Sequence, residues 1–174
     1  PSLYLPGVET ETSQATSETR DGLTITRVLE SNVMAFWIDE SDLTLYTVTA
    51  GGAVISTPHN GSSEVVYAGD GRPLMTAQPN PAGDMVLLTT GSQIEPFISL
   101  FNVITQKRVF LPNTARSALW HPNGKDVLYL RDADAKNSAG LYQLNTAKNS
   151  ATQLSAFSMI GVALQPHTKQ SVLL

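Results

Sequence analysis

The chain has 174 residues, of which 41% are hydrophobic and 15% charged, and its formal net charge is −4. This composition suits one domain with a sizeable core. The acidic balance argues against a nucleic-acid partner or an anionic membrane surface. No stretch approaches the roughly 20 apolar residues of a membrane span, so we expect no membrane insertion by this segment. The absence of cysteine excludes disulfides, thiolate metal sites and cysteine nucleophiles.

The start of the chain differs in composition from the rest. Residues 7–19 (GVETETSQATSET) contain only two aliphatic side chains and are dominated by Thr, Ser and Glu. Such a segment buries too little apolar surface to offset the entropy lost on ordering. We therefore predict that residues 1–22 are a Ser/Thr/Glu-rich linker or a disordered terminus. Residues 23–29 then alternate between apolar and polar side chains, which predicts a strand at the start of a folded segment over 23–174.

A sequence unit then returns at nearly constant spacing. Its copies are AFWIDESDLTLYTV from Ala35, MTAQPNPAGDMVLL from Met75, SALWHPNGKDVLYL from Ser117 and IGVALQPHTKQSVLL from Ile160. One repeat position is occupied by Asp39, Pro81, Pro122 and Pro166, at steps of 42, 41 and 44 residues. A period of roughly 40–45 residues, with four short strands in each unit, is typical of a β-propeller blade. We therefore predict an all-β propeller with four-stranded blades and a repeat of about 42 residues.

Each unit has the pattern of four strands. Residues 118–120 and 127–130 are apolar stretches, and His121–Lys125 between them has turn chemistry, because Pro presets φ while Asn and Gly accept positive φ. Pro166–Lys169 is the corresponding turn of the last copy, with the Pro but without the Gly. Third strands are expected at 53–56, 100–103 and 141–144, and fourth strands at 65–67, 108–111 and 151–154. No window of 11 or more residues has a helical apolar period.

These strands predict blades over about 33–73, 74–114 and 115–157 and a partial blade over 158–174. A propeller closes with at least four blades. We therefore expect an incomplete portion of a larger propeller, or a partner copy that supplies the missing strands. Open blade edges would permit self-association. Trp37 and Trp120 lie two periods apart, which predicts equivalent strand positions and a role in core packing.

The unit resembles the WD-type and TolB-like β-propeller repeat. The resemblance rests on the apolar-W-x-P-x-G-K-x-apolar-aromatic pattern and on the LYQLNT strand, and it covers roughly residues 33 to 174. The Trp-Asp dipeptide and the Gly-His pair of WD repeats are absent, which favours the TolB-like type. In the first copy Asp39–Asp42 replaces Pro-x-Gly-Lys. The resemblance implies a fold and leaves the function open, because propellers carry unrelated functions.

No catalytic or metal-binding constellation stands out. His59, His121 and His167 lie in or beside turns, and no two of them have the spacing of a metal site. Residues 131–137 are similar to the start of a calcium loop but lack the sixth-position Gly and the distal Glu, so a solvated loop is favoured. The acidic turn Asp39–Asp42 has the carboxylates to bind a cation, yet a charged hairpin tip needs no function. Gly-x-Ser-x-Gly and Gly-x-Gly-x-x-Gly are both missing. We predict no N-glycosylation acceptor at Asn60-Gly61-Ser62, Asn137-Ser138-Ala139 or Asn149-Ser150-Ala151. We expect no enzyme activity, no catalytic, cofactor or metal residues, and no cofactor.

Binding is the function that remains. The loops between second and third strands are expected at 49–52, 89–96 and 131–140, and the last two are the longest and most variable. This favours a non-catalytic binding or scaffold module for a protein, or for a saccharide. A Ser/Thr-rich linker before a propeller suits a periplasmic or cell-surface location. The alternatives are the propeller domain of a larger hydrolase of the prolyl-oligopeptidase type, whose nucleophile lies in a separate domain, and a cell-surface spacer.

Overall fold

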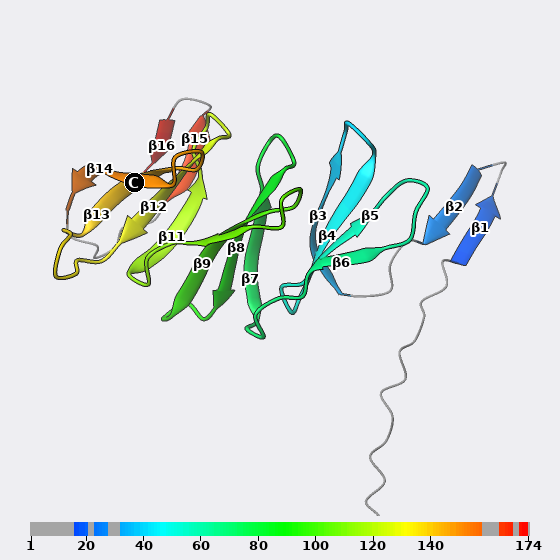
Figure 1. Ribbon diagram of the computed structural model, residues 1–174, viewed down its shortest axis with the longest axis horizontal. Coiled ribbons are helices and arrows are strands. Elements are labelled where there is room, and N and C mark those ends of the chain that lie inside the picture. Colours follow the sequence, from blue (N-terminus) through cyan, green and yellow to red (C-terminus); the bar gives the residue numbers. More distant parts are fainter. Residues whose placement is uncertain (1–15, 21–22, 28–31, 158–163, 169–170, 174) are drawn as a thin grey trace, which may run out of the picture. The chain divides into compact units, whose positions relative to one another are not determined.

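The computed structural model describes residues 16–20, 23–27, 32–157, 164–168 and 171–173, and all regular elements among them are β-strands (Figure 1). The chain divides into two units, Pro1–Asn32 and Val33–Leu174. In the first unit, strand β1 (Thr16–Arg20) pairs antiparallel with β2 (Leu23–Arg27). The strand predicted from residue 23 is confirmed over the residues of β2. Strand β1 lies inside the segment predicted as a linker, because threonine favours extended backbone and a partner strand follows at once.

The second unit contains three four-stranded antiparallel sheets, and in each the strand order follows the chain. Blade 1 consists of β3 (Val33–Asp39), β4 (Thr44–Thr49), β5 (Val54–Thr57) and β6 (Glu64–Tyr67). Blade 2 consists of β7 (Leu74–Pro79), β8 (Met85–Gly91), β9 (Pro96–Asn102) and β10 (Arg108–Phe110). Blade 3 consists of β11 (Ala115–Trp120), β12 (Asp126–Arg131), β13 (Gly140–Asn145) and β14 (Ser150–Ala156). These are the blades of a β-propeller, and the predicted fold class is confirmed.

The hairpin between the first two strands sets the true repeat. Asp39 pairs with Thr44 in blade 1. The backbone N–H groups of Asn80 and His121 donate to the carbonyls of Met85 and Asp126 at 2.8 Å in blades 2 and 3. Four residues separate the partners in each case, so Asp39, Asn80 and His121 are equivalent and both steps are 41 residues. The first step of 42 residues was wrong by one, because without a proline in blade 1 the sequence offers no marker for the turn.

The two tryptophans are consequently not equivalent. Trp37 lies two residues before Asp39, whereas Trp120 lies one residue before His121. Successive side chains of a strand point to opposite faces of the sheet. The predicted equivalence is therefore wrong, and the two indoles face opposite directions along the row of blades. Their role in core packing is nonetheless seen at two different interfaces.

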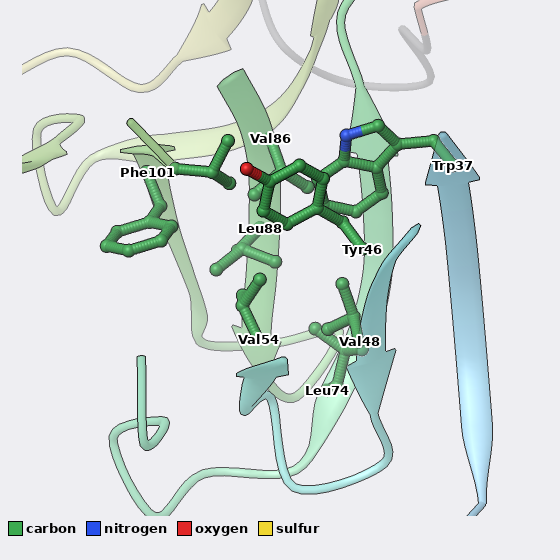
Figure 2. Packing of buried hydrophobic residues seen from close by; sticks show 9 residues of the cluster. Trp37, Tyr46, Val48, Val54, Leu74, Val86, Leu88 and Phe101 are labelled. Carbon is green, nitrogen blue, oxygen red and sulfur yellow. The ribbon is translucent and has the colours of Figure 1, made fainter. Parts of the chain in front are cut away.

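Two hydrophobic clusters hold the three blades together. The first interface, between blades 1 and 2, is formed by Trp37, Tyr46, Val48, Val54, Leu74, Val86, Leu88, Phe101 and Val103 (Figure 2). The second interface, between blades 2 and 3, is formed by Leu87, Ile98, Leu100, Leu111, Ala115, Val127, Tyr129, Tyr142 and Leu144. Strand β8 contributes Val86 and Leu88 to one interface and Leu87 to the other, which explains its continuous apolar run.

The outer face of β3 is apolar and exposed. Met34, Phe36 and Ile38 are 55%, 69% and 54% exposed, and they alternate along the strand with Ala35 and Trp37, which pack toward blade 2. In blade 3 the residue equivalent to Ile38 is Trp120, which packs against blade 2. The exposed face of blade 1 thus corresponds to a face that is covered in blade 3.

The fourth copy folds differently from the prediction. Its first expected strand falls largely in residues 158–163, outside the described residues. Pro166–Thr168, predicted as a turn, instead belong to strand β15 (Gln165–Thr168), which pairs with β16 (Ser171–Leu173).

Candidate functional site

The candidate site is the loop face, defined here by the loops between second and third strands (50–53, 92–95 and 132–139) and the connections between blades (68–73 and 111–114). The strands of each sheet are antiparallel and follow the chain order, so these segments all lie at the same end of the strands. Hydrogen bonds link them there: Leu74 N–H donates to the Ala50 carbonyl, Gly91 N–H to that of Pro73, and Asp132 N–H to that of Thr114, at 3.0, 2.9 and 2.9 Å.

The largest difference from the expected loop lengths is in blade 2. Strand β8 continues to Gly91, which pairs with Pro96, so the middle loop is only residues 92–95. It therefore matches the loop of blade 1 (50–53) in length. The loop of blade 3, residues 132–139, is the long one, as the sequence predicted.

A polar cluster lies between the outgoing connection of blade 1 and blade 2. The Asp70 carboxylate accepts hydrogen bonds from Arg108, Arg72 and Thr90 through its Oδ2 atom, at 3.0, 3.1 and 3.3 Å. Arg108 also donates to Ser99 Oγ at 2.9 Å and to the Tyr67 hydroxyl. The side chains of Arg108 and Asp70 are each 13% exposed. This cluster is internally satisfied, and it joins the two blades.

The charge state of Asp70 follows from these contacts. Burial alone would raise the pKa of the carboxyl, since the charged form loses solvation. Hydrogen bonds from the Arg108 side chain and the Arg72 backbone, with the charge of Arg108, outweigh burial and lower the pKa of Asp70 below its usual value. Asp70 is therefore held ionised as the anion that pairs with Arg108.

The long loop of blade 3 is organised by its own hydrogen bonds. Asp134 Oδ1 accepts the backbone N–H groups of Lys136 and Asn137, both at 2.8 Å, and the Asp134 N–H donates to the Asn137 carbonyl at 2.9 Å. The Tyr142 hydroxyl donates to the Ser138 carbonyl at 2.8 Å, and Arg131 pairs with Asp134. The Lys136 N–H, then the Asn137 side chain and N–H and the charge of Arg131, lower the pKa of Asp134 against a small opposing effect of burial. These hydrogen bonds hold the loop in one conformation.

The same hydrogen bonds occupy the carboxylate that the calcium-like motif would have offered to a cation. Within the ranges that the structure describes, no group of three or more His, Asp or Glu side chains is placed to hold a metal ion.

An exposed arginine connects the long loop to its neighbour. Arg116 donates to the Ile94 carbonyl at 2.8 Å and pairs with Asp132. The Ile94 side chain is 81% exposed, the highest value among the large hydrophobic side chains described. Phe97 follows Ile94 by three residues, and the Arg72 guanidinium lies 3.8 Å from the centroid of the Phe97 ring. The loop face thus presents an isoleucine, arginines and carboxylates on a fixed framework.

The other residues considered from the sequence lie elsewhere. His59 is exposed in the β5–β6 loop, and His121 Nδ1 accepts the Asn123 N–H at 3.1 Å within its turn. His167 lies in β15. In the acidic turn, Asp39 Oδ1 accepts the Ser41 N–H and Asp42 Oδ1 the Thr44 N–H, both at 2.9 Å. Their carboxylates therefore have a structural role in the turn.

The prediction that Asn60-Gly61-Ser62 is no N-glycosylation acceptor is wrong. The three residues match the Asn-x-Ser pattern, and all of them are exposed in the β5–β6 loop. The residue after Gly61 is serine, which is the signal that identifies the motif.

In the part of the chain that the structure covers, there is no helix with the length and apolar character needed to span a membrane.

No model of a known protein family matches the chain, and no curated protein matches it. Among solved structures, the chain is similar to TolB from Acinetobacter baumannii, with 19% identity and a TM-score of 0.47, over 76% of this chain and 35% of that one. It is also similar to a chain of a nidogen/laminin complex, with 10% identity and a TM-score of 0.47, over 80% of this chain and 56% of that one. The chain thus spans about a third and about half of these structures. At these identities the likeness concerns the fold alone.

Proposed function

We propose that this chain is a non-catalytic β-propeller module that binds a protein partner through the loop face. The observation that carries the proposal is the long loop of blade 3, which is held in one conformation by Asp134 and Tyr142. A loop ordered in advance loses little conformational entropy on binding. Binding residues are disproportionately found on loops that a rigid scaffold positions.

The side chains beside this loop fit a protein more closely than a saccharide. Ile94 exposes an aliphatic side chain, and Arg116 fixes the backbone beneath it. Arginine is enriched at protein interfaces, where a desolvated apolar centre with a polar rim is the usual arrangement. Ile94 surrounded by Arg116 and Asp132 has this arrangement on a small scale.

The absence of catalysis belongs to the same proposal. The Arg and Asp side chains of the loop face bind one another or backbone groups, and the histidines lie apart. Turnover of a general esterase or peptidase substrate by the purified chain, abolished by a single Ser or His substitution, would overturn the non-catalytic part of the proposal.

A paired substitution tests the location of the binding surface. Ile94→Ser changes the loop face, while Ile104→Ser changes an isoleucine that is 67% exposed in the β9–β10 loop of the same blade. The immobilised chain and its two variants are incubated with the same cell extract, and the retained proteins are identified by mass spectrometry. Proteins that the native chain retains should be lost with Ile94→Ser and kept with Ile104→Ser. Equal retention by both variants would overturn the loop face as the binding surface.

An extracytoplasmic location and self-association complete the proposal. The Ser/Thr-rich start of the chain supports the first, and the exposure of Phe36 and its neighbours on β3 supports the second. Light scattering of the purified chain is expected to show a mass above that of the monomer. Phe36→Ser should lower that mass, and a monomer at all concentrations would exclude self-association.

A further inference from the structure

A groove lies at the end of the strands opposite the loop face. At this end, hairpins join the first strand to the second and the third to the fourth in each blade. The groove runs between blades 2 and 3, has a volume of about 170 Å³, and is lined by Met85, Leu100, Asn102, Thr105, Lys107, Val109, Leu144, Thr146 and Asn149. Its apolar members are Met85, Leu100, Val109 and Leu144. Leu100 and Leu144 belong to the second interface, so the groove opens onto the core between the two blades.

The size of the groove limits what it accepts. Pockets for drug-sized ligands occupy about 300–1,000 Å³, so this one has room for a single side chain or a similarly small group. Met85 can adapt its shape to an occupant because it has three rotatable side-chain bonds. One branched aliphatic side chain of a peptide, such as leucine, matches both the volume and the apolar floor.

The lining of the groove is positively charged although the chain as a whole is acidic. Lys107 is the one charged residue that lines it, and Lys107 is exposed. The ion pairs found among the described residues all join Arg to Asp, and none of them includes Lys107.

A different hollow lies between the first hairpins of blades 1 and 2. It is lined by Asp39 and Glu40 together with Trp37 and the turn Asn80–Gly83, and it has a volume of about 320 Å³. Other strands form it, so it is not the counterpart of the groove, but its charge is opposite. An acidic ligand is attracted to Lys107 in the groove and repelled by the carboxylates of this hollow.

We propose that the groove between blades 2 and 3 binds an acidic-apolar peptide segment, with one aliphatic side chain on the apolar floor and a flanking carboxylate at Lys107. Burial of a leucine side chain supplies affinity. Lys107 selects for a carboxylate and speeds the encounter at low salt. This site is independent of the loop face.

The test uses the full chain and the peptide SGDLEGS, which is labelled with fluorescein and amidated at its C-terminus. The same peptide, acetylated in place of the label, serves as the unlabelled competitor. Fluorescence anisotropy should give a Kd below about 1 mM, with affinity falling as salt is raised. A peptide in which Ser replaces Leu, and one in which Lys replaces both acidic residues, should each bind at least about tenfold more weakly. No binding of SGDLEGS at millimolar concentration would overturn the proposal, as would equal binding of all three peptides.

A matched pair of charge reversals locates the site. Lys107→Glu should weaken binding of SGDLEGS by about tenfold or more, whereas Lys136→Glu, at an exposed lysine in the long loop at the other edge, should leave it within about twofold. Both lysines are exposed, so both variants should fold, and circular dichroism spectra will show it. Equal weakening by the two variants would mean that overall charge, and not the groove, attracts the peptide.

Discussion

The two blade interfaces use the same device from opposite sides. At the first interface, Trp37 of blade 1 packs toward blade 2, and its Nε1–H donates to the Gly83 carbonyl at 2.8 Å. At the second interface, Trp120 of blade 3 packs toward blade 2, and its Nε1–H donates to the Gln78 carbonyl at 2.8 Å. Each interface thus has one indole near the first hairpin, bonded to a backbone carbonyl across the junction. The blade that supplies it differs.

This difference shows that packing between blades does not require the tryptophan at one fixed position of the repeat. An interface needs a large apolar side chain with a satisfied N–H, and either of the facing blades can supply it. The spacing of two periods between the tryptophans predicted one fixed position for this side chain. The structure shows that side chains at two neighbouring positions of the first strand fill the role.

The polar contacts also differ between the interfaces. The first contains the cluster of Asp70, Arg108 and Tyr67, and the Arg108 guanidinium lies 4.8 Å from the Tyr67 ring centroid. The second has Tyr129 and Tyr142 stacked with ring centroids 5.5 Å apart. We therefore expect the first interface to depend more strongly on charge.

The largest expected effect is that of removing the buried indole. Trp37 is 9% exposed and stacks on Tyr46 with ring centroids 5.3 Å apart. Trp37→Ala should lower the free energy of unfolding by about 4 kcal/mol, measured by urea denaturation. Trp120→Ala should cost less, because Trp120 is only half-buried. Equal losses would show that the two interfaces have the same dependence on their indoles.

The next effect separates the polar cluster from surface ion pairs. Arg108→Ala leaves Asp70 charged in a mostly buried position, and we expect a loss of about 3 kcal/mol in the free energy of unfolding. The control is Arg116→Ala, whose side chain is 45% exposed, and its loss should stay below about 1 kcal/mol. Similar losses for the two variants would indicate that the cluster does not stabilise the first interface.

Much of the architecture could be predicted from the sequence because the hairpins of blades 2 and 3 carry their own markers. Pro81 with Gly83, and Pro122 with Gly124, fix the turn and hence the face of every following residue. In blade 1 the turn lacks these residues, and positive φ falls on Leu43 instead. A one-residue error there exchanges the two faces of β3, which is why the direction of Trp37 was not predicted.

The polar contacts were beyond prediction for a different reason. Asp70 and Arg108 are separated by 38 residues. Each is unremarkable in its own segment, and only the packing of one blade on the next brings them together. The length of the blade 3 loop was readable from the sequence, whereas its ordering by Asp134 depends on backbone N–H groups that no residue pattern reveals.

A smaller effect should appear when pH is varied. The pKa of Asp70 is lowered in the folded chain, so its contribution to stability is present above its unfolded pKa of about 4 and is lost as pH falls through the folded value. Thermal unfolding of the native chain and of Asp70→Asn should therefore differ most at neutral pH. The two melting temperatures should converge as pH is lowered below about 4. A constant difference down to pH 2 would contradict an ionised Asp70 as the stabilising species.

The smallest expected effect tests the register itself. Asp39, Asn80 and His121 occupy the same position, and a side-chain atom of each accepts a backbone N–H of its own hairpin, from Ser41, Met85 and Asn123 respectively. His121→Asn places the residue of blade 2 at this position in blade 3, and we expect the free energy of unfolding to change by less than about 0.5 kcal/mol. His121→Ala removes the acceptor and should cost about 1 kcal/mol. If asparagine proved as costly as alanine, position 121 would not be equivalent to position 80, and the repeat of 41 residues would be wrong.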